Sequence, residues 1–295
     1  MRFDGFDLCI LNMVNKNSRL EEKVIVITGA AGGIGSATAH LFAQHGAILV
    51  LTDIQRKKLE ELGKILEDLG ARMLLVEHDV TDPESWKSIM EKVKKEYSKI
   101  DILINNAGIV QPGAMEKISL DKIQQQVSVN LLGTIYGSRA ALCIMKEQNF
   151  GKIINVASLG GIVPMPGEAV YSATKYAVRG FSLSLYAELH NSPVRIAVVC
   201  PDSVDTPQLD YELLYDEAVL SFIGKSLKPE KVAQGILNAV LKKKPEKLIP
   251  AGMGALSRTG MAFPRVFFFL FPLLKKIGIS TIKKRRQEKK KNGKY

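Results

Sequence analysis

A tyrosine and a lysine, Tyr171 and Lys175, are separated by three residues in the run VYSATKYAV. Residues four apart on a helix project from the same face, so the phenol and the ammonium are expected to lie side by side. A nearby cation favours the phenolate, which lets a tyrosine exchange protons near neutral pH. The pair therefore predicts acid–base chemistry, although an isolated pair of this kind more often belongs to an ordinary amphipathic helix with a solvated lysine.

A glycine-rich turn, TGAAGGIG, follows the apolar run KVIVIT and precedes the helical pattern SATAHLFAQHG. Glycines let the backbone approach a pyrophosphate closely, and the amides at a helix N-terminus favour its negative charge. On its own the turn is explained equally well as a tight connection between a strand and a helix. Its place after the first strand, with an acidic residue about twenty positions later, indicates a dinucleotide site.

That acidic residue is Asp53, at the end of the run ILVLTD. A carboxylate there can accept hydrogen bonds from the adenosine ribose hydroxyls and would repel a 2′-phosphate, so NAD is favoured over NADP. Arg56 and Lys57 follow closely and leave NADP as the less favoured alternative. Asp53 can also be interpreted as the N-cap of a helix that begins near Gln55.

The elements that must position these residues alternate between short β-rich runs and longer helical patterns. Because parallel strands need crossover connections, which are usually helices, this alternation predicts one α/β domain with a doubly wound parallel sheet. We expect an N-terminal extension over residues 1–20, the domain over 21–252 and a C-terminal tail over 253–295. The expected strands are residues 23–28, 47–52, 73–77, 101–106, 152–157, 194–199 and 247–250.

With its further motifs the chain resembles the short-chain dehydrogenase/reductase family over about residues 20 to 250, which implies a Rossmann-type fold. TGAAGGIG matches the family's TGxxxGxG, a DV pair follows the third strand, and NNAG ends the fourth. The catalytic tetrad of the family is matched by Asn130, Ser158, Tyr171 and Lys175. The resemblance also implies a set of residues that contact the cofactor. They are Thr28, Gly29, Gly33, Ile34, Gly35, Asp53, Asp79, Val80, Asn106, Ala107, Gly108, Tyr171, Lys175, Pro201, Val204 and Thr206.

The same resemblance implies a role for each member of the tetrad. Tyr171 would be the acid or base at the substrate oxygen, and Ser158 would hold and polarise that oxygen. Lys175 would lower the pKa of Tyr171 and bind the nicotinamide ribose, and Asn130 would fix a water that passes protons to solvent. The cofactor supplies the hydride, so no metal is expected.

The sequence departs from the family after the sixth strand, where PDSVDTP places Asp202 at a position that is commonly glycine. Val204 and Thr206 still stand where the family binds the nicotinamide carboxamide. A similar run occurs in reductases of long-chain lipid ketones such as 3-ketodihydrosphingosine, which usually prefer NADP. The NADP preference of those reductases conflicts with the NAD preference that Asp53 indicates.

The substrate lid is expected over residues 208–227, where apolar and aromatic side chains offer a wall for a bulky hydrophobic substrate. The same residues are equally well explained as packing of the lid on the core. They are Leu209, Tyr211, Leu213, Leu214, Tyr215, Val219, Leu220 and Phe222.

The net charge of +11 is concentrated at the C-terminus. Residues 275–295 contain ten Lys or Arg and one acid, a charge of +9, which leaves +2 for the rest and argues against nucleic-acid binding by the fold itself. An apolar cluster from Phe263 to Leu274 precedes these lysines and is too short to span a bilayer. This combination favours peripheral attachment to an anionic membrane surface. The alternatives are a dimer interface with a solvated tail, or nucleic-acid contact by the lysines.

At the other end of the chain, Asp4 and Asp7 stand where a secretory signal would carry positive charge, and a start at Met13 in place of Met1 stays open. Three widely spaced cysteines among 295 residues indicate neither a disulfide framework nor a zinc site. We expect a cytoplasmic protein on the cytoplasmic face of a membrane, a homodimer or homotetramer by family resemblance.

These observations predict an NAD-dependent oxidoreductase that interconverts a secondary alcohol and a ketone on a lipid-like or steroid-like molecule. One alternative is an NADPH-dependent reductase of long-chain ketones, of the 3-ketodihydrosphingosine reductase type. The alternative from another class is a non-catalytic membrane-bound scaffold that retains nucleotide binding.

Overall fold

The computed structural model describes residues 20–291 of the chain. The predicted N-terminal extension, apart from Leu20, lies outside the described residues, and so do the two candidate start positions and residues 292–295.

Seven parallel strands form one sheet in the order β3-β2-β1-β4-β5-β6-β7. The strand order reverses between β1 and β4, which makes this the switch point where doubly wound sheets bind ligands. All seven predicted strand runs and the parallel arrangement are confirmed. The strands are β1 Val24–Thr28, β2 Ile48–Asp53, β3 Arg72–Glu77, β4 Ile102–Asn105, β5 Gly151–Val156, β6 Val194–Pro201 and β7 Glu246–Ile249.

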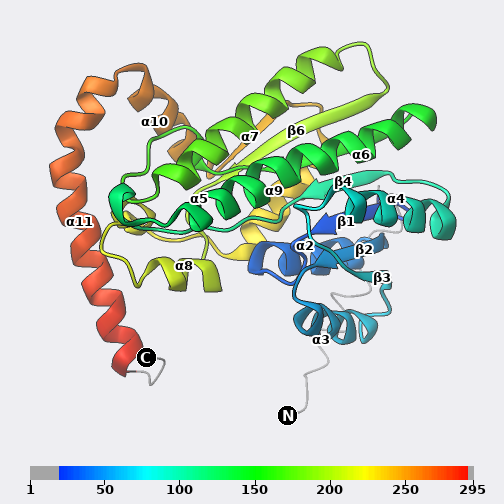
Figure 1. The fold of residues 1–295 in the computed structure, drawn as a ribbon, viewed down its shortest axis with the longest axis horizontal. Helices are drawn as coiled ribbons and strands as arrows, with labels where there is room; N and C mark the ends of the chain where they lie inside the picture. The colour runs from blue at the N-terminus through cyan, green and yellow to red at the C-terminus, as the bar shows by residue number, and fades with distance from the viewer. Residues whose placement is uncertain (1–19, 292–295) are drawn as a thin grey trace.

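Helices cover both faces of the sheet (Figure 1). On one face lie α2 (Gly33–Gln44), α3 (Arg56–Glu67) and α9 (Pro229–Leu241). On the other lie α4 (Pro83–Tyr97), α6 (Gly133–Glu147) and α7 (Ala169–Glu188). The remaining helices are α5 (Leu120–Val127), α8 (Pro207–Glu212), α10 (Ala251–Ala262), α11 (Pro264–Lys291), the π-helical turn η2 (Ser128–Leu132) and the 3₁₀ turns η1 (Met115–Lys117), η3 (Leu159–Gly161) and η4 (Val219–Phe222).

The apolar runs become strands because both of their faces are buried. Along β1, Ile25 and Ile27 contribute to the core on the side of Phe42, and Val24 and Val26 to the core on the side of Trp86. A strand covered on both sides needs a continuous apolar run without polar alternation. Burying each such side chain stabilises the fold by about 1.5–3 kcal/mol.

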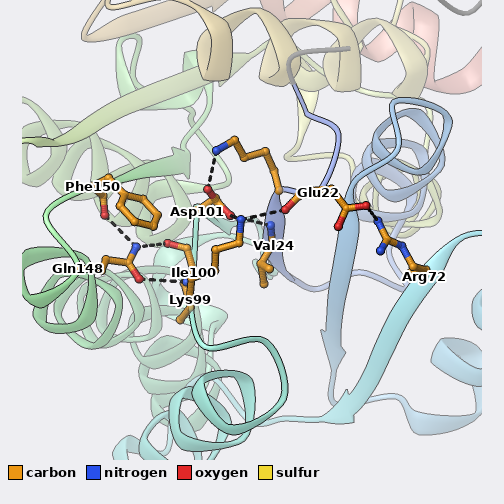
Figure 2. A network of polar contacts seen from close by, with 9 residues as sticks. Glu22, Val24, Arg72, Lys99, Ile100, Asp101, Gln148 and Phe150 are labelled. Carbon is orange, nitrogen blue, oxygen red and sulfur yellow. Dashed lines mark hydrogen bonds and ion pairs between the residues drawn. The ribbon is translucent and has the colours of Figure 1, made fainter. Parts of the chain in front are cut away.

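Asp101 links the starts of β1 and β4 at the amino end of the sheet (Figure 2). Its carboxylate accepts hydrogen bonds from Lys23 Nζ at 2.8 Å and from the amide of Val24 at 2.9 Å, and it pairs with Lys99 Nζ at 3.0 Å. Burial alone would raise the pKa of Asp101, but these hydrogen bonds outweigh it and lower the pKa below its usual value. The arrangement keeps the carboxylate charged while it fixes the two strands.

We expect Asp101→Asn to lower the free energy of unfolding at neutral pH by about 1–3 kcal/mol, since charge-assisted bonds are lost. Because the pKa of Asp101 is depressed by folding, its stabilisation is present above the unfolded-state pKa and is lost as pH falls through the folded-state pKa. Urea unfolding at several pH values tests this. A stability difference between the two proteins that persisted undiminished in strong acid would contradict the prediction.

The C-terminal segment folds against the lid region. Helix α11 continues through Pro272 and the lysine-rich run, and lies along one end of the molecule beside α8 and α10 (Figure 1). A Cβ added to Gly278 would come within 2.3 Å of the carbonyl oxygen of Val219, so α11 and η4 approach each other closely. Ile282 of α11 is buried with Phe222 in the same apolar cluster.

Ion pairs hold the basic half of α11 to the lid. Arg286 pairs with Asp216 at 2.8 Å and donates from Nε to the carbonyl of Leu213 at 2.7 Å. Lys289 pairs with Asp210 of α8. The prediction of a C-terminal tail treated these charges as free for a membrane, whereas part of them is used within the fold.

By length and hydropathy alone, one helical stretch in the described part of the chain is suited to cross a membrane, Leu120–Glu147. In the fold this stretch runs from α5 through η2 into α6. Ala141 and Met145 of α6 are fully buried against the sheet. Core helices of globular domains share this composition.

Candidate active site

Two loops meet at the carboxyl ends of β1 and β4. The hydroxyl oxygen of Thr28 accepts hydrogen bonds from the amides of Asn106, at 3.0 Å, and Ala107, at 3.1 Å. The Asn106 side chain donates in return to the carbonyls of Thr28, at 3.0 Å, and Gly29, at 3.1 Å. The glycine turn and the NNAG loop, distant in sequence, thus form one rigid edge.

Three glycines of the turn leave no room for a side chain. Gly29 has φ +61°, and a Cβ there would lie 2.8 Å from Ala107 Cα. A Cβ on Gly33 would meet the Thr206 methyl at 2.5 Å, and one on Gly35 would lie 2.2 Å from the Gly29 carbonyl oxygen. Helix α2 begins here after Gly32 with no side-chain cap, so its first amides face outward from a bare backbone surface. This surface fits a pyrophosphate group.

Asp53 lies beside the turn at the end of β2. One carboxylate oxygen accepts a hydrogen bond from the amide of Ala31 at 3.0 Å and the other from the amide of Gln55 at 2.9 Å. The N-cap of α3 is Gln55, so the interpretation of Asp53 as that N-cap is wrong. The carboxylate is instead fixed next to the glycine turn.

The DV pair lies at the end of β3. Asp79 is exposed and accepts hydrogen bonds from the amide and the hydroxyl of Thr81 at 2.9 and 2.8 Å. Val80 is buried, and a Cβ on Gly133 would lie 2.8 Å from its side chain. Val80 therefore packs helix α6 onto the sheet.

Tyr171 and Lys175 lie one turn apart on α7, as the spacing predicts. The Lys175 ammonium lies 5.7 Å from the centre of the Tyr171 ring and donates to the carbonyl of Val156 at 3.0 Å. Burial lowers the pKa of Lys175 to about 8. Burial, followed by the charge of Glu212, raises the pKa of Tyr171, while a hydrogen bond with Ser158 lowers it. The net rise is opposite to the lowering expected from the Tyr–Lys pair, and keeps Tyr171 a protonated phenol at neutral pH.

Asn130 lies within the π-helical turn between α5 and α6 and is fully buried. Its Oδ1 accepts from the amide of Ile109 at 2.8 Å, and its Nδ2 donates to the carbonyl of Ile109 at 2.9 Å and to Thr174 Oγ1 at 3.1 Å. Its own carbonyl accepts from Thr134 Oγ1 at 2.8 Å. The side chain thus ties the loop after β4 to α7.

A cavity of about 620 Å³ opens over the tyrosine. Nine of the predicted catalytic and cofactor-binding residues line it: Ile34, Asn106, Gly108, Ser158, Tyr171, Lys175, Pro201, Val204 and Thr206. Thr28, Gly29, Gly33, Gly35 and Ala107 form the adjoining backbone edge, while Asp53, Asp79, Val80 and Asn130 lie outside the cavity wall.

The residues predicted for the substrate lid fall into two groups, those that line the cavity and those that pack the lid on the fold. Leu209 and Leu220 line the cavity. Leu213, Val219 and Phe222 are buried in the cluster with α11, with Tyr215 packed against it, and Leu214 is exposed. Tyr211 donates to the side chain of Gln111 at 2.9 Å. Most of the lid side chains therefore fix the lid in place.

Sequence reasoning missed two parts of this site. The first is the contribution of α10 and α11 to the cavity wall through Met253, Leu256, Ser257, Thr259, Gly260, Phe263, Val266, Phe267, Leu270 and Leu274. The apolar spacing from Phe263 to Leu274 was a usable signal for a helix face. Nothing in that spacing identified the cavity as its partner.

The second is a pair of buried carboxyls next to Tyr171. Glu168, just before α7, accepts from the Ser221 hydroxyl at 3.1 and 3.3 Å, and Glu212 of α8 lines the cavity. Burial first, and then their mutual proximity, raise the pKa of Glu168 well above its usual value, and burial raises the pKa of Glu212. Within residues 20–291 no lysine or arginine pairs with either carboxyl. The pair joins the lid to the start of the catalytic helix.

We expect Glu212→Gln to lower the pKa of Tyr171, because the substitution removes a negative charge that opposes the phenolate. Alcohol oxidation needs the deprotonated tyrosine, so the rise of kcat/KM with pH should occur at lower pH than in the wild type. The pH–rate profile of oxidation measures this shift. Glu217→Gln, the same change elsewhere on the lid, should leave the profile in place, and an unmoved profile for Glu212→Gln would contradict the prediction.

Comparison with known proteins agrees with this geometry. A family model described as short chain dehydrogenase matches residues 23–213. The chain is 38% identical over 224 residues to the 3-oxoacyl-(acyl-carrier-protein) reductase FabG of Thermotoga maritima, covering 74% of this chain and 90% of that protein. It is 35% identical over 187 residues to 3-ketodihydrosphingosine reductase of Bacteroides thetaiotaomicron, covering 63% and 66%. A short chain dehydrogenase/reductase from Burkholderia phymatum, solved in complex with NAD, superimposes with a TM-score of 0.75 at 28% identity, covering 81% and 92%.

Proposed function

This chain belongs to the short-chain dehydrogenase family, and from that premise we propose that it interconverts a secondary alcohol and a ketone on a hydrophobic, lipid-like or steroid-like molecule. The family establishes an oxidoreductase that acts on CH–OH groups with NAD or NADP. The observation that carries the substrate class is the apolar cavity of about 620 Å³ that contains Ser158 and Tyr171 on its wall. A cavity of this size accommodates a lipid-like or steroid-like molecule.

In the proposed mechanism the substrate oxygen binds between Ser158 and Tyr171. The Tyr171 phenol donates its proton to a carbonyl oxygen in reduction, and the phenolate accepts the alcohol proton in oxidation. The Ser158 hydroxyl stabilises the charge that develops on that oxygen. When bound, the nicotinamide supplies or takes the hydride at the substrate carbon.

Lys175 and Asn130 are proposed as positioning residues for this step. Gly108 separates them, since a Cβ there would lie 3.3 Å from Lys175 Nζ and 3.4 Å from Asn130 Oδ1. The low pKa of Lys175 lets the ammonium exchange a proton near neutral pH. A water on the Asn130 carbonyl would continue this exchange toward solvent.

We propose NAD as the preferred cofactor. The Asp53 carboxylate is held beside the glycine turn by two backbone amides, where it would repel a 2′-phosphate. Arg56, the nearest cation in sequence, is paired with Glu60 at 2.8 Å. Both observations support NAD over NADP. Asp79 and Val80 at the end of β3, and Thr28, Ile34, Pro201, Val204 and Thr206, are proposed to complete the binding surface.

The second candidate is an NADPH-dependent reduction of long-chain ketones. The similarity to 3-ketodihydrosphingosine reductase favours it. The two candidates share the cavity and the tyrosine, and they differ in the cofactor and in the direction of the reaction.

We further propose peripheral attachment to an anionic membrane on the cytoplasmic side. Exposed Phe269 and Leu273 on α11, together with the lysines that follow them, support this attachment. Self-association as a dimer or tetramer is expected by family resemblance, and light scattering measures it.

The test is the absorbance of reduced nicotinamide when purified protein is offered NAD or NADP with steroids, long-chain acyl alcohols and sphingoid bases. Turnover with NAD on a hydrophobic alcohol is the expected result. Turnover with NADP alone would favour the second candidate. Binding of nicotinamide without turnover on the whole panel would contradict both.

A further inference from the structure

The rim of the cavity consists of apolar side chains that are partly exposed. Leu256 of α10, Val266 of α11 and Phe263 between the two helices line the cavity while 65%, 55% and 65% of their surface is exposed. Met253 and Leu270 share both properties. A route from the protein surface to Tyr171 therefore passes between α10 and α11, past these apolar side chains.

An exposed apolar stripe continues from this rim along α11. Val266, Phe269, Leu270, Leu273 and Ile277 recur at three- and four-residue intervals, which places them on one face of the helix. Phe269 is 83% exposed and does not line the cavity. The opposite face, with Gly278 and Ile282, is packed on the lid. Val266 and Leu270 belong to both the rim and the stripe, and α11, which carries them, is fixed to the fold.

Positive charge lies directly beside the stripe. Lys276, Lys283 and Lys284 are exposed, and within the described chain none of them forms an ion pair. Arg286 and Lys289, by contrast, are held on the lid. Exposed aromatic residues with free lysines beside them match the surface of an anionic bilayer in both polarity and charge.

We propose that the rim and the stripe face the hydrocarbon layer of an anionic membrane, so that the substrate enters the cavity directly from the bilayer between α10 and α11. This inference rests on the proposed function, because it needs a hydrophobic substrate at Tyr171. Beyond that function, the inference specifies how the protein is oriented on the membrane and that the substrate comes from the bilayer. The exit of the product follows the same route.

Orientation is tested by residue-specific quenching. Trp86 is the one tryptophan of the chain and is buried, so it gives a constant background. In vesicles of phosphatidylcholine and phosphatidylserine with brominated acyl chains, the tryptophan fluorescence of a Phe269→Trp variant should be quenched by the bromine atoms. A Leu120→Trp variant, at an exposed apolar site on α5, should not. Equal quenching of both variants, or quenching of neither, would overturn the proposed orientation.

The route of entry is tested with one carbonyl group in two forms: a water-soluble short-chain ketone, and a long-chain ketone dissolved in the same vesicles. At constant bulk concentration the rate on the long-chain ketone should follow its mole fraction in the vesicle. A Phe269→Glu, Leu273→Glu double variant should lose about tenfold in this rate while its kcat/KM on the soluble ketone is unchanged. The matched control is Ile65→Glu, Leu120→Glu, which charges two exposed apolar sites elsewhere.

The outcomes separate this inference from the proposed function. Turnover of the soluble ketone, lost in Tyr171→Phe, with a vesicle rate that ignores mole fraction would overturn bilayer entry and leave the function intact. A double variant that changes from dimer to monomer in light scattering, with no change in vesicle binding, would assign the stripe to a second copy of the chain. Absence of any Tyr171-dependent turnover, with Phe269→Trp still quenched, would remove the proposed function and the entry route while the orientation stands.

Discussion

Tyr171→Phe is expected to lower kcat/KM by about 10²–10⁴-fold in both directions, because it removes the group that transfers the proton. The ring remains, so the cavity wall and the packing of α7 are preserved. Nicotinamide binding should be nearly unaffected, since the glycine turn, Asp53 and Lys175 are all unchanged. Turnover is followed by nicotinamide absorbance and cofactor binding by the fluorescence of the reduced form.

Tyr176→Phe is the matched control for this experiment. Tyr176 lies on the same helix, does not line the cavity, and donates its hydroxyl to the carbonyl of Ile162. The control loses a hydrogen bond and no catalytic group, so it should keep its activity at temperatures where it is folded. Comparable losses in the two variants would mean that packing of α7, and not proton transfer, explains the effect.

Asp53→Ser is expected to weaken NAD binding by about 10- to 100-fold, the loss of hydrogen bonds to a charged acceptor. The same change removes the repulsion of a 2′-phosphate, so binding of NADP should improve and the preference for NAD should fall. Titration with NADH and NADPH gives both dissociation constants. The amides of Ala31 and Gln55 also lose their acceptor, so a small fall in melting temperature accompanies the change.

Asp53→Asn separates these two effects. Asparagine keeps one oxygen for a backbone amide but has no charge to repel phosphate. It should therefore show the altered preference with a smaller loss of stability than Asp53→Ser. A wild-type protein that binds NADPH more tightly than NADH would contradict the role given to Asp53 and would favour the long-chain ketone reductase.

The sheet was predictable because its signals are local. Each strand is a short apolar run, and the helical patterns between the runs favour parallel pairing. The meeting of the glycine turn with the NNAG loop follows from the same topology, since both follow neighbouring strands at the same edge. The spacing of Tyr171 and Lys175 predicted their common helix face for a similarly local reason.

The parts that were not predictable depend on contacts between distant segments. Glu168 and Glu212 are ordinary acids in the sequence, and only the docking of α8 onto the start of α7 makes them a buried pair. The pKa of Tyr171 is raised first by the burial of the phenol itself and then by the charge of Glu212, a direction that its spacing to Lys175 did not indicate. Helix α11 continues through Pro272, although a proline inside a helix usually kinks or ends it, and Phe271 and Ile282 on either side of it are packed with the lid.

The close approach of Gly278 to Val219, with the Arg286–Asp216 and Lys289–Asp210 pairs, has a practical meaning for redesign. Residues 208–227 and helix α11 form a single exchangeable module, although residues 228–263 separate them in the chain. A lid transplanted from a relative without its own C-terminal helix would bring a surface that clashes with Gly278 or lacks its ionic partners. Variant libraries that aim at new substrates should therefore change residues 208–227 and helix α11 together.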